Sequence, residues 1–90
     1  MKLVGKRHVA EFDGPPMAKR RLSLWCREVA VAKWRSLEDL QSDHRRASRV
    51  GGNLVRFDFE GQPVFVEAAI SFVASVVFIE RVGHVPAQAA

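Results

Sequence analysis

The spacing of apolar residues along the chain changes at Leu54. Over residues 17–35 they recur every three or four positions, which places them on one stripe of an amphipathic helix. From Leu54 the spacing becomes two, with Val55, Phe57 and Phe59 on one side of an expected strand. This change of period predicts helices followed by strands, which is an α+β fold.

Shorter signals divide the first part of the chain. Residues 4–12 are expected to form a short helix or strand, which the Gly-Pro-Pro run at 14–16 ends. Ser36 and Asp39 have the spacing of a capping box, so a second short helix begins there. Residues 44–49 carry three arginines and a histidine, and we interpret them as a basic connector.

Glycines and a proline separate the expected strands. Residues 51–53 form a turn, and the strands that follow cover residues 54–60, 64–72 and 73–82. We therefore expect one domain over residues 1–90, with N-terminal helices packed on a three- to four-stranded antiparallel sheet. It is mainly helical over 1–49, has antiparallel strands over 50–84 and ends in a tail over 85–90.

The charge of the chain is unevenly distributed. The net charge is +4, but residues 1–56 carry 13 of the 14 lysines and arginines, whereas residues 57–90 carry a net −3. The basic part favours a polyanionic or acidic partner. A single cysteine, Cys26, excludes an internal disulfide framework, and we expect it to be a small buried apolar residue.

Other classes of protein are excluded by spacing and length. The three histidines and the cysteine do not have the spacing of zinc ligands, so we expect no metal and no cofactor. The longest uncharged stretch, residues 68–79, is too short to span a bilayer as a helix. We therefore expect a soluble cytoplasmic protein without membrane contact. Trp25 and Trp34 are expected to lie in the core rather than to stack on nucleotide bases.

Three segments, in order and at matching spacing, resemble a known family. These are LSLWCREVAVAKWRSLEDL at residues 22–40, ASRVGGNLVRFDFEG at 47–61 and VVFIERVGH at 76–84. Together they are similar to the HigB-type toxins of bacterial type II toxin–antitoxin systems, within the RelE/ParE superfamily. The resemblance implies a compact RelE-like fold and a ribosome-dependent endoribonuclease that cleaves translated mRNA without a metal. It also implies a helix-turn-helix antitoxin as the inhibiting partner, with DNA contacted indirectly through that antitoxin.

The resemblance, together with the chemistry of the side chains, gives candidate site residues. We expect His84 to transfer protons, and Arg56 and Arg81 to stabilise the charge that develops on the phosphate. Contacts with RNA phosphates are expected from the basic connector, through Arg45, Arg46 and Arg49.

The departures from the family pattern keep two other functions open. Leu54 stands where the family has an arginine, Glu80 replaces a basic residue of the last strand, and the chain contains no tyrosine. One alternative is a catalytically degenerate toxin homologue that binds its antitoxin or the ribosome. The other is a generic RNA- or ribosome-binding module unrelated to toxins.

Overall fold

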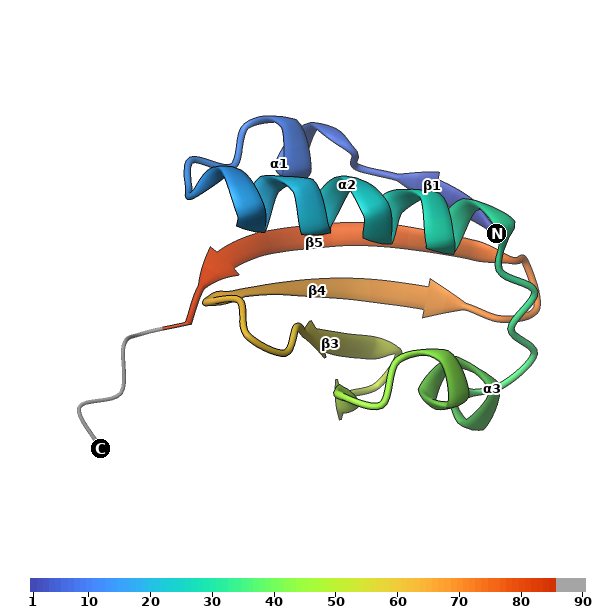
Figure 1. Ribbon diagram of the computed structural model, residues 1–90. Helices are drawn as coiled ribbons and strands as arrows, with labels where there is room; N and C mark the ends of the chain where they lie inside the picture. Colours follow the sequence, from blue (N-terminus) through green and yellow to red (C-terminus); the bar gives the residue numbers. More distant parts are fainter. Residues whose placement is uncertain (86–90) are drawn as a thin grey trace.

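A computed structural model of the chain describes residues 1–85, and it places three helices beside one five-stranded sheet (Figure 1). The helices are α1 (Arg7–Ala10), α2 (Pro16–Val31) and α3 (Leu37–Asp43). The strands are β1 (Lys2–Val4), β2 (Ala47–Gly51), β3 (Leu54–Asp58), β4 (Val64–Ser71) and β5 (Val76–His84). The predicted α+β class is confirmed.

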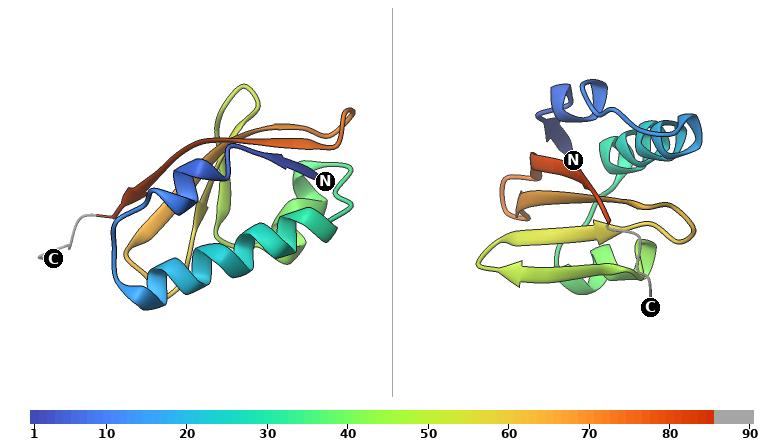
Figure 2. Two further views of the ribbon diagram at one scale, coloured as in Figure 1. Left: turned by 90° about the horizontal axis from the view of Figure 1, so that it is seen from above. Right: turned by 90° about the vertical axis from the view of Figure 1, so that its left-hand side faces the viewer.

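The strand order is β1-β5-β4-β3-β2, so the first strand of the chain lies beside the last. This pair is parallel, whereas the three other neighbouring pairs are antiparallel. The expectation of three to four antiparallel strands was therefore too low, and it missed the parallel pair. The views from above and from the side show α1 and α2 on the same side of the sheet (Figure 2).

Both additional strands lie at the edges of the sheet. Residues 4–12 were expected to form one element, but the chain makes β1, turns at Gly5 with φ of 92°, and then forms α1. The basic connector at 44–49 was also partly wrong, because Ala47 begins β2, which pairs with β3 through a hairpin. Residues 1–49 therefore contain two strands besides the helices.

Helix α2 provides much of the core. The core-facing apolar side chains of this helix are completely buried against the sheet. The helix begins at Pro16, and proline is favoured at the first position of a helix because the N–H that it lacks would have no partner there. The buried stripe consists of Ala18, Leu22, Trp25 and Val29. The helix ends at Val31 rather than Arg35, since Ala32 adopts an extended conformation.

Because α2 ends at Val31, the extended chain that follows places Trp34 in the core. The indole ring lies 6.3 Å from the ring of Phe57, and its Nε1–H donates to Asp43 Oδ2 at 2.8 Å. Trp25 packs edge-on against the same phenylalanine at 5.1 Å. The expectation that both tryptophans belong to the core is confirmed.

Helix α3 begins as the sequence predicts. Ser36 Oγ accepts a hydrogen bond from the backbone N–H of Asp39 at 3.2 Å. The Asp39 carboxylate accepts from the N–H of Arg35 at 2.9 Å, one residue earlier than a regular capping box requires. No helix within residues 1–85 is long and apolar enough to cross a membrane.

Candidate functional site

Arg56 and Arg81 meet on the face of the sheet opposite to α2. The guanidinium carbon of Arg56 lies 3.9 Å from the centre of the Phe65 ring, and that of Arg81 lies 5.1 Å from it. Val64 and Val66, the neighbours of Phe65 in the chain, face the helical side, so Phe65 points to the opposite face. It is nevertheless buried. Cations at these distances are attracted to the negative face of the ring.

A β-bulge brings Arg81 to this face. Ala68 pairs with Ile79 and Glu67 with Arg81, so the ladder contains one residue more in β5 than in β4. In a regular strand the side chain after Glu80 would turn toward the helical side. The extra residue instead places Arg81 beside Glu67, and Val82 returns to the core side.

Two carboxylates complete what we call the open-face cluster, which consists of Arg56, Asp58, Phe65, Glu67 and Arg81. Arg81 Nε donates to Glu67 Oε1 at 2.8 Å, and this bond raises the pKa of Arg81. Arg56 Nε donates to Asp58 Oδ1 at 3.3 Å. Glu67 is opposite Arg56 in one ladder and opposite Arg81 in the other, so it lies between the two arginines. The cluster is neutral in sum, but each guanidinium has five N–H donors, and these bonds use Nε.

His84 lies on the other face of the sheet. It pairs with Val64 in the ladder, and since side chains alternate along a strand, it faces the opposite side from Arg81. Its ring packs 4.7 Å from the ring of Phe12, and Nε2 lies 3.0 Å from the carbonyl oxygen of Asp13. Since that oxygen is an acceptor, Nε2 carries the proton. The structure thus joins Arg56 with Arg81 and separates His84 from both.

The three arginines of the basic connector do not form one patch. Arg45 and Arg46 lie in the turn before β2, where they line a hollow of about 170 Å³ together with the acidic residues Asp43, Asp58 and Glu60. Arg46 Nε is 3.9 Å from Glu60 Oε1. Arg49 is in β2 opposite Val55, on the other side of that strand from Ser48, which pairs with Arg56.

A family model described as HigB toxin, RelE-like toxic component of a toxin-antitoxin system, matches residues 18–84. The chain belongs to the HigB toxin family. No curated protein matches the chain.

The match covers α2 to β5 and includes every residue of the open-face cluster. The chain is therefore the toxin of a toxin–antitoxin system, and its family implies an antitoxin partner. Among Glu67, Asp58 and Phe65, which complete the cluster, none was predicted as a site residue. Phe65 could have been noticed in the sequence, because it is a large apolar residue at a position of β4 that alternates away from the core-facing valines.

Two further titratable groups of this HigB-family toxin lie among apolar side chains. His44 packs edge-on against Trp34 and Phe57 at 5.5 and 5.4 Å. Burial lowers its pKa, and nearby Arg21 lowers it as well, while Glu28 and Asp43 act in the opposite direction. Burial raises the pKa of the half-buried Cys26 thiol, with nearby Lys6 acting in the opposite direction, which leaves the thiol protonated and unreactive at neutral pH. In residues 1–85, no three side chains of the metal-binding kinds His, Cys, Asp and Glu gather at one place.

Proposed function

We propose that this toxin is a ribosome-dependent endoribonuclease that cleaves mRNA, arrests translation and is neutralised by a helix-turn-helix antitoxin. The observation that supports it is the convergence of Arg56 and Arg81 on Phe65. The ring fixes one side of each guanidinium, so the donors on Nη1 and Nη2 can bind phosphate oxygens in a defined geometry.

The proposed reaction is a transesterification that uses side chains alone. The ribose 2′-oxygen attacks the adjacent phosphorus, the bond from phosphorus to the 5′-oxygen breaks, and a 2′,3′-cyclic phosphate and a 5′-hydroxyl result. Arg56 and Arg81 stabilise the charge on the phosphoryl oxygens. The proton of the 2′-hydroxyl passes to a base, and the leaving 5′-oxygen gains a proton.

Two residues are candidates for the base. The carboxylate of Glu67 lies between the two arginines, at the place where the phosphate would bind. The sequence proposes His84 instead, whose ring faces the other side of β5. Replacing Glu67 with Gln and His84 with Gln separates these assignments, because the loss of the true base flattens the dependence of the cleavage rate on pH.

The internal ion pairs of the cluster support the dependence on ribosomes. A phosphate that binds the Nη donors of Arg56 and Arg81 comes close to Asp58 and Glu67, and both carboxylates repel it. The affinity of the cluster for free RNA is therefore low. A ribosome that holds the mRNA in place raises the effective concentration of one phosphate at the cluster.

The test is cleavage of a defined mRNA by the full chain in a reconstituted translation mixture. We expect Arg56→Gln and Arg81→Gln each to lower the cleavage rate about 10²-fold. Arg35→Gln, which removes an exposed arginine from the linker before α3, is the matched control and keeps the rate. Intact mRNA with the wild-type chain, or equal rates for all variants, would contradict the proposal.

A second candidate is a degenerate toxin that binds its antitoxin or the ribosome without cleaving RNA. Two observations favour it. The open-face cluster has no net charge, and His84 lies on the opposite face of the sheet from the two arginines. It predicts that the chain sediments with ribosomes, leaves mRNA intact and does not slow growth when expressed alone.

A further inference from the structure

The outer face of α2 presents a row of exposed apolar side chains. Met17, Leu24 and Val31 are 68%, 48% and 77% exposed and lie seven residues apart. Seven residues are close to two helical turns, so the three side chains follow one line along the helix for roughly 21 Å. We call this line the α2 stripe. Single exposed apolar residues are ordinary, but three at regular heptad spacing along one line form an ordered series of apolar contact points.

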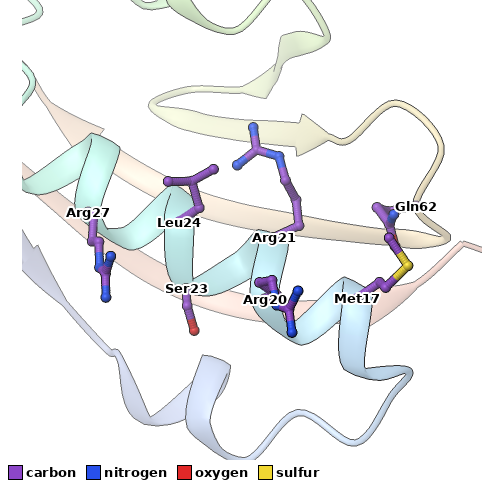
Figure 3. Close-up of a pocket in the computed structure, with 7 residues that line it drawn as sticks. All are labelled: Met17, Arg20, Arg21, Ser23, Leu24, Arg27 and Gln62. Atoms are coloured by element: carbon purple, nitrogen blue, oxygen red, sulfur yellow. The ribbon is translucent and has the colours of Figure 1, made fainter.

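Basic residues border the α2 stripe. Arg20 and Arg27 extend to one side of the helix and Arg21 to the other, while Met17 reaches toward Gln62 of the β3–β4 loop (Figure 3). These side chains, with Ser23 and Leu24, line a hollow of about 380 Å³.

The charges on this face that have no partner among residues 1–85 are positive. Arg21 pairs with Glu28 at 3.3 Å, and Glu28 is the one acidic residue of α2. Arg20 and Arg27 make no ion pair with any residue in the described range 1–85. An occupant of this face thus has to bury apolar surface along the stripe and to supply negative charge beside it.

We infer that the α2 stripe is the docking site for an acidic amphipathic helix of the antitoxin. Apolar side chains of that helix at heptad spacing pack on Met17, Leu24 and Val31, and its carboxylates pair with Arg20 and Arg27. The inference rests on the proposed neutralisation by an antitoxin and is independent of RNA cleavage, since the stripe lies on α2 and the open-face cluster on the other side of the sheet.

A second copy of the chain fits this face poorly. In a symmetric contact between two α2 helices, the same surface meets itself. Arg20 and Arg27 of one copy would then approach basic residues of the other, and like charges in an interface repel. The observed charge favours a partner of opposite sign.

The test measures binding of the full chain to a designed, fluorescently labelled helical peptide with leucines at heptad spacing and glutamates beside them. We expect saturable binding, with the affinity weakened at least about tenfold by Leu24→Asp and by Arg20→Glu with Arg27→Glu. Val50→Asp, at an exposed apolar residue of β2, and Arg35→Glu are the matched controls and keep the affinity. Circular dichroism verifies that each variant is folded.

Each contrary result has a definite meaning. The inference is overturned if the wild-type chain does not bind the peptide, if the stripe variants bind as well as the controls, or if a peptide with lysines in place of the glutamates binds equally. A concentration-dependent dimer that Leu24→Asp abolishes would assign the stripe to a second copy. Binding to vesicles of anionic lipid with the same sensitivity would assign it to a membrane surface.

A cleavage assay separates this inference from the proposed function. Variants of the α2 stripe that lose the peptide still cleave mRNA, whereas Arg56→Gln and Arg81→Gln bind the peptide normally. If cleavage is absent in every variant while the peptide results stand, the nuclease proposal fails and the docking site remains.

Discussion

Phe65 lies so close to Gly83 that no side chain fits between them. A β-carbon at Gly83 would approach Cζ of Phe65 to 2.7 Å, inside the limit of van der Waals contact. We expect Gly83→Ala to push the ring aside and to lower the free energy of unfolding by about 1–3 kcal/mol. Gly51→Ala is the control, because nothing lies within 4 Å of the β-carbon there. Denaturation in urea measures both.

The same contact has a consequence for the cluster. If the ring of Phe65 moves, Arg56 and Arg81 lose the surface on which they stack. Adding Phe65→Leu to Gly83→Ala should restore stability, because the smaller side chain removes the clash, but it should not restore cleavage. Additive stability losses in the double variant would show that the two residues do not interact.

The bulge at Glu80 predicts that two single-residue deletions in β5 have different effects. Removing Glu80 leaves Arg81 as the residue after Ile79, and a regular ladder then places it opposite Glu67, on the open face. We expect the deletion variant to fold and to retain mRNA cleavage, because Arg81 keeps its place. Deleting Val82 instead places Gly83 opposite Val66 and disturbs the contact with Phe65, so it should abolish cleavage. Loss of activity on deleting Glu80 would contradict the assigned role of the bulge.

The hydrogen bond from Trp34 to Asp43 fixes the linker between α2 and α3. Asp43→Ala leaves the half-buried indole N–H without its acceptor at 2.8 Å, so we expect a loss of about 1–2 kcal/mol in stability. Asp39→Ala removes a carboxylate from an exposed bond of the same helix and should cost less. A chemical denaturation curve of each variant provides the comparison; equal losses would refute the special role of the Trp34 bond.

His44 makes stability depend on pH. Burial lowers its pKa in the folded chain, whereas the unfolded chain binds the proton with a pKa near 6.5. The unfolded state therefore holds more protons between the two values, and stability is full above about pH 6.5 and declines as the pH falls toward the folded pKa. We therefore expect the urea midpoint of the wild type to be higher at about pH 7.5 than at about pH 5.5.

A matched histidine variant isolates this effect. His44→Gln should reduce the difference between the two urea midpoints, although it also costs packing against Trp34 and Phe57. His84→Gln, at an exposed ring, should leave the difference in place. If both variants respond to pH as the wild type does, His44 is not the group responsible.

The elements with strong periodicity could be predicted from the sequence, and the edge strands could not. Helix α2, β3 and β4 each bury one regular face, which their apolar spacing records. Strand β2 is exposed on nearly all its residues, so it has no alternation and resembles a basic loop. Strand β1 has three residues, and its partner lies at the other end of the chain, where local patterns carry no information.

The candidate site shows the same division. Arg56 could be placed on the polar face of its strand, because the period of β3 is regular. The position of Arg81 depends on a bulge that no turn residue announces, and unbroken alternation along the strand would instead point it away from the site. Alternation along β5 separates Arg81 from His84, since His84 is three residues beyond Arg81 and the strand is regular between them.

The pairing of β1 with β5 determines when the toxin becomes complete during its own synthesis. Lys2 and Val4 are synthesised before their partners Val76 and Phe78, which follow all the other strands in the chain. Contacts of such sequence separation form late in folding, because a long loop has to close first. The nascent chain thus cannot complete its sheet until β5 has been synthesised.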